Sequence, residues 1–271
     1  MAHLGFVFQA VAWDNEFMAM LPVTGIILIG QKTIHLKKVI DSLAWTSELI
    51  LFDNNSGYDF SQLSGERMHR ISESEPISDF SAIRQELQAR ATQPWVFFVD
   101  SDEVVQVISL LELAKQLENP SLHGLSVMRS DVFLGKALEY GEAGDQPLVR
   151  MIRPEYTRWQ NAVHEVAVVS GQLAVAPIRI DHHSHESISE FVGQVIEYSK
   201  LAAQSRSSTP AKNLMELLFF PPLKLFYGLV IQGGALDGWR GVIYAFCMSL
   251  HSLLVRIYWY ESHQVLEKPQ A

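Results

Sequence analysis

The segment Trp95-Val96-Phe97-Phe98-Val99-Asp100-Ser101-Asp102-Glu103 joins an apolar run to a group of acidic side chains. Its first five residues are all apolar, which is typical of a strand that is buried on both faces of a sheet. Asp100 stands where this strand is expected to end. Ligands of open α/β sheets bind beyond the carboxyl ends of the strands, so the segment indicates both a fold and the position of a site.

Two more buried strands are predicted before this segment. Residues 23–29 and 48–52 are short apolar runs, and apolar side chains between them, at 34–43, recur near helical spacing. A strand, a helix and a strand in this order predict a right-handed βαβ unit with parallel strands. The second strand runs into Asp53, so Asp53 and Asp100 are expected at the same edge of the sheet.

The rest of the chain extends this pattern into an α/β fold, with a mixed, mainly parallel sheet flanked by helices and a C-terminal helical extension. A stretch rich in Gly and acidic residues at 134–145 is expected to be a mobile loop over the site. We expect an N-terminal extension at 1–20, a catalytic domain at 21–205 and a helical region at 206–271. The further predicted elements are helices at 80–91, 104–118 and 188–203 and strands at 125–129, 163–169 and 173–180.

Composition narrows the classes of partner. The formal net charge is −9 and the pI about 5.6, so no basic field is present to hold a nucleic acid backbone. The single cysteine, Cys247, excludes an internal disulfide and fits a reducing compartment. The apolar stretch at 4–13 lacks a basic flank and does not resemble a signal peptide. We therefore expect a cytoplasmic protein that does not bind nucleic acid.

The carboxylates of Asp100 and Asp102 predict a metal site. Two carboxylates at positions i and i+2 can hold a hard divalent cation that also binds a diphosphate. An acidic, solvated turn is the alternative for such a short pattern. The position at the end of a buried strand, directly followed by Glu103, favours the metal site.

Two other motifs are candidates for the same site. Arg150 and Arg153 offer planar forks for phosphate, and Glu165 can take the proton of an attacking hydroxyl group. The cluster Asp181-His182-His183-Ser184-His185 could supply imidazole ligands to a metal. Surface arginines, a glutamate at a strand edge and exposed histidines are the alternatives for these motifs.

In their order, these motifs resemble family 2 glycosyltransferases, and within them the bacterial lipopolysaccharide-core glucosyltransferases. The resemblance covers roughly residues 22–260, and the order of several motifs is more specific than any one of them. It includes Asp237-Gly238-Trp239-Arg240-Gly241 near the C-terminus. The other matching segments are Leu49-Ile50-Leu51-Phe52-Asp53, the stretch from Trp95 to Glu103, Arg150-Met151-Ile152-Arg153, Val163-His164-Glu165 and His182-His183-Ser184-His185-Glu186-Ser187.

The resemblance implies a GT-A fold, a nucleoside diphosphate sugar as donor, usually a UDP-sugar, and Mg or Mn as cofactor. It also implies that the configuration of the transferred sugar is inverted. The implied roles are contact with the nucleoside base for Asp53, approach to the nucleotide for Arg84, ribose or metal binding for Asp100, metal binding for Asp102, catalytic base for Glu165, and completion of the metal and diphosphate site for His182.

Two segments depart from the family pattern. Members often carry Asn-Glu-Glu after the first strand, whereas this chain has Gln31-Lys32-Thr33-Ile34-His35. An acidic nucleotide contact is therefore missing there, and Lys32 reverses the local charge. The turn after Asp53, Asn54-Asn55-Ser56-Gly57-Tyr58-Asp59, also differs from the usual sequence. These departures leave the identity of the donor open.

The last quarter of the chain carries a different kind of surface. Residues 206–271 hold six of the 21 Lys and Arg residues but only four of the 30 Asp and Glu residues. Apolar stretches at 214–231 and 241–260 approach the ~20 residues of a spanning helix, but aromatic and basic residues at their ends also suit helices that lie in the membrane interface. Helices packed on the core or on a second subunit are a further alternative. We expect peripheral attachment at the inner face of the membrane, close to a lipid-linked acceptor.

The sequence therefore predicts an inverting, metal-dependent transfer of a hexose to a hydroxyl of a cell-envelope glycan or glycolipid. A sugar-phosphate nucleotidyltransferase is one alternative, but it needs a glycine-rich basic loop that Gly30-Gln31-Lys32-Thr33 does not supply. A non-catalytic membrane or assembly module is another. The presence of Asp100, Asp102 and Glu165 argues against it.

Overall fold

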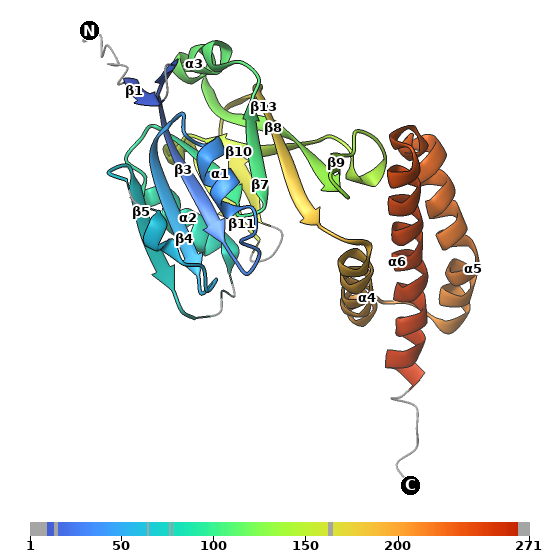
Figure 1. Cartoon of the computed structure of the whole chain (residues 1–271). Coiled ribbons are helices and arrows are strands. Elements are labelled where there is room, and N and C mark those ends of the chain that lie inside the picture. The colour runs from blue at the N-terminus through green and yellow to red at the C-terminus, as the bar shows by residue number, and fades with distance from the viewer. Residues whose placement is uncertain are drawn as a thin grey trace. The chain divides into compact units, whose positions relative to one another are not determined.

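The computed structural model describes residues 10–13, 16–63, 65–75, 77, 79–161 and 165–264 (Figure 1). The chain divides into two compact units. The first consists of Met1–Arg129 and Pro147–His182, and the second of Ser130–Gln146 and His183–Ala271. The strands β8 (Leu122–Phe133) and β13 (Gln172–His185) continue from the first unit into the second.

The central sheet confirms the expected α/β fold. Its strand order is β5-β4-β3-β6-β10-β8-β13-β7, and β9 (Lys136–Ala137) pairs with β8. β5, β4, β3 and β6 run parallel to one another. β10 pairs with β6, and β7 with β13, in antiparallel fashion. The bounds are β3 Leu21–Ile29, β4 Thr46–Asn54, β5 Met68–Glu73, β6 Trp95–Asp100, β7 Glu103–Val107 and β10 Gln146–Ile152.

Alternate side chains of β6 enter two different cores. Trp95, Phe97 and Val99 pack with residues of α1 (Leu36–Ser42) and α3 (Leu110–Glu118) on one face of the sheet. Val96 and Phe98 pack with α2 (Phe80–Arg90) and with the hairpin of β11 (Thr157–Gln160) and β12 (Val166–Val169) on the other face. An apolar run without alternation is therefore explained by burial on both faces.

The register of the parallel strands brings the two predicted aspartates to one edge. Leu28 of β3 pairs with Asp100, and Ile29 pairs with Asp53. Neighbouring strands lie about 4.8 Å apart, so Asp53 and Asp100, with β3 between them, are separated by roughly 10 Å. Short 3₁₀ turns complete the connections at Phe60–Gln62 and Pro154–Tyr156.

The helix predicted at 104–118 is wrong in its first turn. The strand β7 occupies Glu103–Val107, and α3 begins only at Leu110, after Ser109 accepts a hydrogen bond from the backbone of Glu112. β-Branched valines fit a pleated strand better than a helix, and Val105 pairs with Ile180 of β13. The apolar spacing of this segment suited both structures, and pairing with a distant strand decided between them.

The segment at 134–145, expected to be a loop, contains regular secondary structure. It contains β9 and a 3₁₀ turn at Gly141–Ala143. The buried carboxylate of Asp237 accepts hydrogen bonds from the backbone amides of Glu139, at 3.1 Å, and of Tyr140, at 2.9 Å. These contacts fix the segment within the second unit.

The second unit is built around three helices (Figure 1). α4 (Ile188–Ser205) and α5 (Pro210–Phe226) both pack against α6 (Trp239–Gln264), with a π-helical turn at Tyr227–Ile231 and a 3₁₀ turn at Gly234–Asp237 before α6. We placed α4 in the catalytic domain from sequence, whereas its contacts place it in the second unit. The boundary therefore falls near His183 rather than at 205. The core of this unit includes Phe133, Leu138, Phe191, Val195, Tyr244 and Cys247.

The N-terminal segment lies partly outside the described residues. Positions 1–9, 14 and 15 of the expected extension at 1–20 are among those not described. Within the described part, β1 (Ala10–Trp13) pairs with β2 (Glu16–Ala19) in antiparallel fashion.

The two C-terminal helices differ in exposure. Pro210–Ile231 and Trp239–His263 are both long and apolar enough to cross a membrane. Only 6% of the first apolar segment is buried, against 33% of the second. We call the exposed apolar side chains of the first segment the α5 stripe; they are Leu214, Met215, Leu218, Phe219, Phe220, Leu223, Phe226, Tyr227, Val230 and Ile231. Cys247 of α6 is buried, and burial raises the pKa of its thiol.

Candidate active site

The end of β6 places two acidic side chains next to each other. Glu103 begins β7 after a two-residue turn, and its Oε2 accepts a hydrogen bond from the backbone amide of Asp100 at 3.0 Å. Glu103 is 0% exposed. The hydroxyl of Ser101, in the turn, donates to the carbonyl of Lys32 at 2.7 Å. This bond connects the site to the segment at 31–35, whose sequence departs from the family pattern.

Arg150 forms ion pairs with both carboxylates. It lies on β10, which pairs with β6, and its Nη2 is 3.1 Å from Asp100 Oδ2 and 2.9 Å from Glu103 Oε1. Arg129 adds a weaker contact to Glu103, at 3.5 Å. Burial would raise the pKa of Asp100, but the charges of Arg150 and Arg84 hold it well below its usual range. Conversely, burial would lower the pKa of Arg150, but Glu103 and Asp100 raise it.

Arg84 links the predicted base to the predicted metal motif. Its Nε and Nη2 lie 2.8 and 2.7 Å from Glu165 Oε1, and its Nη2 is 3.3 Å from Asp100 Oδ1. The guanidinium carbon lies 5.1 Å from the ring centres of both Phe98 and Trp159. Arg84 is almost fully buried, and its Nη1 has no hydrogen-bond partner among the residues that the structure describes.

Asp102 and His182 meet at this edge. His182 of β13 pairs with Glu103 of β7, and its Nε2 lies 3.6 Å from Asp102 Oδ2. Two ligand atoms of one octahedral ion stand about 3 Å apart, so these two atoms need only a small shift to share a cation. Both oxygens of Asp100 contact arginines, which makes Asp100 a less available ligand. Of the three predicted metal ligands, Asp102 and His182 are therefore the two placed to share an ion.

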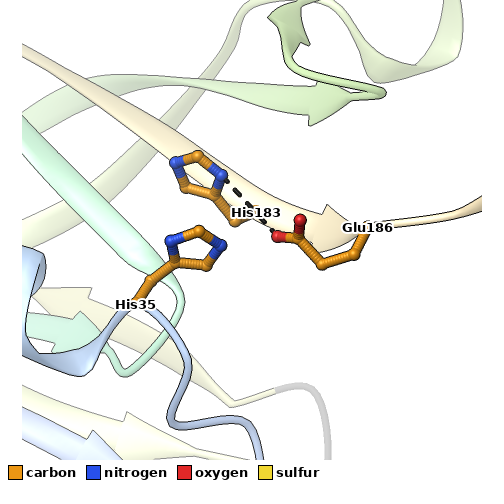
Figure 2. Close-up of side chains that lie close together, drawn as sticks. All are labelled: His35, His183 and Glu186. Carbon is orange, nitrogen blue, oxygen red and sulfur yellow. Dashed lines mark ion pairs between the residues drawn. The ribbon is translucent and has the colours of Figure 1, made fainter.

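The other histidines of the cluster have different surroundings. In the second unit, His183 Nδ1 is 4.0 Å from Glu186 Oε1, and Figure 2 shows this ion pair. The ring of His185 stacks on Phe191 with ring centres 4.1 Å apart. Successive side chains of a strand point to opposite faces, which explains why the neighbours of His182 do not share its contacts.

Asp53 closes the turn that follows β4. Its Oδ1 accepts hydrogen bonds from the backbone amide and the hydroxyl of Ser56, and its Oδ2 is 2.6 Å from Arg70 Nη2. Burial would raise the pKa of Asp53, but the hydrogen bonds from Ser56 and Arg70 lower it overall. Asp53 thus stays ionised at the sheet edge. A role in nucleoside binding remains a prediction.

Arg153 does not join this cluster. Its Nε and Nη2 donate to the carbonyls of Leu122 and Leu117, at 3.0 and 3.2 Å, and its guanidinium stacks 4.6 Å from the ring centre of Trp95. Trp95 begins β6, whereas Asp100 ends it, so Arg153 lies toward the opposite end of that strand. These contacts support a structural role for Arg153, and its role in phosphate binding stays a prediction.

Several contributors were not predicted from sequence. Glu103 belongs to the acidic motif without a predicted role, and no sequence pattern indicates a role for Arg129, Arg70 or Trp159. Arg70 lies on the polar strand β5, where no apolar pattern marked an element. Trp159 lies on β11, a four-residue strand that no apolar pattern in the sequence indicates. Val163 and His164, which precede Glu165 in its motif, lie outside the described residues.

We predict that Arg153→Met lowers the free energy of unfolding by about 1–3 kcal/mol, because two carbonyls lose their charged donor. Urea unfolding monitored by circular dichroism measures the change. Arg158→Met is the matched control, since Arg158 is exposed and its loss should change stability by no more than about 0.5 kcal/mol. Equal stability of the two variants would contradict the structural role of Arg153.

Comparison with known proteins gives one relative that spans the chain. The lipopolysaccharide core biosynthesis glycosyltransferase LpsC of Rhizobium meliloti is 24% identical over 265 residues, which cover 92% of this chain and 96% of that protein. A TPR repeat-containing protein of Synechococcus elongatus is 28% identical over 124 residues, 44% of this chain and 28% of its own length. No protein-family model matches the chain.

Solved structures of TarS from S. aureus are also similar. One covers 90% of this chain and 53% of its own length with a TM-score of 0.39, and a TarS 1–349 structure covers 92% and 93% with a TM-score of 0.38; both are 10% identical. Scores this low do not by themselves define a shared fold. The likeness to LpsC runs along nearly the whole of both chains, and it confirms the resemblance to lipopolysaccharide-core glycosyltransferases and supports glycosyltransferase function.

Proposed function

We propose that the protein transfers a hexose, with inversion, from a nucleoside diphosphate sugar, in the first instance a UDP-sugar, to a hydroxyl of a cell-envelope glycan or glycolipid. The supporting observation is the convergence of Asp100, Asp102, Arg150, Glu165 and His182 at the carboxyl end of β6. These residues come from separate sequence motifs and lie where ligands of α/β sheets bind. The likeness to LpsC along the chain supports the same reaction class.

The charge balance of the site favours a metal-dependent reaction. Asp100, Glu103 and Glu165 face three arginines, Arg84, Arg129 and Arg150, so this cluster is close to neutral before any ligand arrives. A diphosphate would add negative charge that the arginines have no spare charge to offset. A divalent cation at Asp102 and His182 would supply the missing positive charge and would stabilise the leaving nucleoside diphosphate.

The ligand set suits Mn better than Mg. Carboxylate oxygens serve both ions, but an imidazole is a better ligand for transition metals than for Mg. Asp102 and His182 would be the protein ligands. Asp100 would join them if Arg84 or Arg150 released one of its oxygens, and otherwise it would orient those arginines toward the donor.

Glu165 is the proposed catalytic base, and its contact with Arg84 limits when it can act. While Glu165 Oε1 accepts hydrogen bonds from Arg84, that oxygen is not free to accept a proton from a hydroxyl group. The unpartnered Nη1 of Arg84 is a donor suited to a phosphate oxygen. In our proposal, the guanidinium of Arg84 turns from Glu165 to the bound diphosphate. Glu165 is then free to take the proton of the acceptor hydroxyl.

Asp102→Asn tests the metal site. We expect loss of Mn-dependent turnover and of the Mn-dependent gain in UDP-sugar affinity, because the amide removes the anionic ligand. Turnover is measured by release of UDP over a series of Mn concentrations, and UDP-sugar affinity by titration calorimetry with and without Mn. The control is Asp41→Asn on α1, whose side chain makes an exposed i,i+4 pair with Lys37. An unchanged Mn dependence in Asp102→Asn would refute the assignment.

Glu165→Gln tests the base. Transfer should fall by about 10² or more, in the range for loss of general base catalysis, while UDP-sugar affinity is retained. Single-turnover rates and titration calorimetry give the two quantities. Glu155→Gln, at an exposed position of the same unit, should match the wild type. Weaker UDP-sugar binding with an unchanged transfer rate would make Glu165 a binding residue instead.

We further propose that the second unit attaches the enzyme to the inner face of the cell membrane. The α5 stripe exposes ten large apolar side chains on one helix and the π-helical turn that follows it. Contiguous exposed apolar surface of this kind marks protein or membrane contacts. Lys212 and Lys224 lie on the same helix and could meet anionic lipid. Arg256 of α6 cannot do so, because it is buried and pairs with Glu216.

Two prolines within α5 favour interfacial attachment over a span. Pro221 and Pro222 have no amide hydrogen, so the carbonyls of Leu217 and Leu218 lose their helical donors. In the interface, water can satisfy these groups, whereas in the hydrocarbon core they would need protein partners. We therefore expect α5 to lie along the membrane surface.

Flotation with phosphatidylglycerol vesicles tests this attachment. The intact chain should float, and the double variant Met215→Glu/Phe219→Glu should not, because charge opposes burial of the α5 stripe. Leu201→Glu on α4, also exposed and in the same unit, is the control. A chain cut near Ser208 is a poorer test, because it removes Tyr244 and Cys247 from the core of the unit.

The salt and extraction responses separate the remaining alternatives. High salt should release only part of the bound protein, since the apolar contribution is not screened. Carbonate should extract it completely. Retention after carbonate would indicate a spanning helix, and failure of the intact chain to float would indicate that the helices serve only folding or association.

A further inference from the structure

The second unit contains an open groove at the C-terminal end of α5. Its volume is about 490 Å³, within the range of roughly 300–1,000 Å³ that is usual for small-molecule sites. Five apolar side chains line it: Phe220, Leu223, Phe226, Tyr227 and Ile231. All five belong to the α5 stripe, so the groove opens on the same surface that we propose to meet the membrane.

One ion pair lies among these apolar walls. Lys224 Nζ is 2.8 Å from Glu142 Oε1, and the two side chains are 35% and 38% exposed. An ion pair with this much solvent contact contributes little to stability. Lys224 can therefore exchange Glu142 for another anion without a large cost to the fold.

Backbone contacts help to hold the groove in shape. The amide of Gly141 donates to the carbonyl of Gln232 at 3.0 Å, which joins the 3₁₀ turn that carries Glu142 to the π-helical turn. The backbone is also closely packed around Gly234, between the π-helical turn and α6. A Cβ at Gly234 would stand 2.7 Å from the carbonyl oxygen of Gly228, and one at Gly241 would clash with Gly234. A preformed groove loses little entropy when it is filled.

We propose that this groove takes one acyl chain of an anionic membrane lipid, with the lipid phosphate replacing Glu142 as the partner of Lys224. The proposal rests on the membrane attachment proposed above. An acyl chain would enter from the bilayer along the α5 stripe without crossing water. The groove combines apolar walls with one exchangeable ion pair, Lys224–Glu142, which suits an amphiphile with a single anionic end better than a polar ligand.

A second copy of this chain is the competing occupant of the same surface. The two occupants differ in what they require of the groove. An acyl chain needs free depth between Leu223 and Ile231, whereas self-association through the α5 stripe depends on the whole exposed face. Filling the groove with a larger apolar side chain therefore separates them.

The experiment uses the intact protein and dodecyl phosphate below its micelle concentration, followed by titration calorimetry, with inorganic phosphate as a second ligand. We expect saturable binding of one dodecyl phosphate and none of inorganic phosphate. Leu223→Trp and, independently, Ile231→Trp should weaken binding by about tenfold or more, because the apolar chain loses its buried contacts. Lys224→Gln should weaken binding but not abolish it.

Leu214→Trp is the matched control, since it makes the same change on the same stripe outside the groove. It should bind dodecyl phosphate as the wild type does. Equal weakening in Leu214→Trp and Leu223→Trp, or non-saturable binding, would overturn the proposal. A doubled mass by light scattering that Leu214→Trp and Leu223→Trp both abolish would assign the face to a second copy.

Vesicle flotation distinguishes failure of the groove from failure of membrane attachment. Leu223→Trp keeps the stripe apolar, so it should still float with phosphatidylglycerol vesicles. A wild-type protein that floats but does not bind dodecyl phosphate would refute the groove and leave the attachment standing. Saturable dodecyl phosphate binding by a protein that does not float would refute the attachment and support the groove.

Discussion

Acidic side chains that are removed from water at the end of β6 need cations beside them, and this constraint organises the first unit. Glu103 is fully buried next to Asp100, and an unpaired buried carboxylate is too costly to persist. Arg150 from β10 pairs with Glu103, and Arg84 from α2 pairs with Asp100. The antiparallel strand beside β6 and the helix beneath the sheet are thereby fixed at the same point as the acidic edge.

The same constraint shows which parts of the site could be predicted. The strand that ends at Asp100 was marked by an unbroken apolar run, and its role followed from the geometry of parallel sheets. Arg150 and Arg153 looked equivalent in sequence, yet positions three apart along extended chain face opposite ways, and only Arg150 reaches the carboxylates. The contributions of Arg129 and Arg70 depend on long-range pairing, which leaves no local pattern.

The second unit was predicted less well, for a different physical reason. Its helices were recognised by their apolar composition, but composition does not say which side chains are covered. The structure buries one face of α6 against α4 and α5, whereas α5 leaves its apolar side chains exposed. Arg256 illustrates the difference, because a basic residue near aromatic neighbours suited a lipid contact and is instead paired with Glu216 inside the unit.

The single cysteine gives the molecule an internal reporter. Cys247 lies in the core of the second unit, and its thiol is both shielded and, through burial, less readily ionised. A thiolate is the reactive form, so alkylating reagents can modify this position only when α6 separates from its neighbours. The modification rate of the unaltered chain therefore measures how often these helices come apart, with no label to be introduced and no second thiol to confuse the signal.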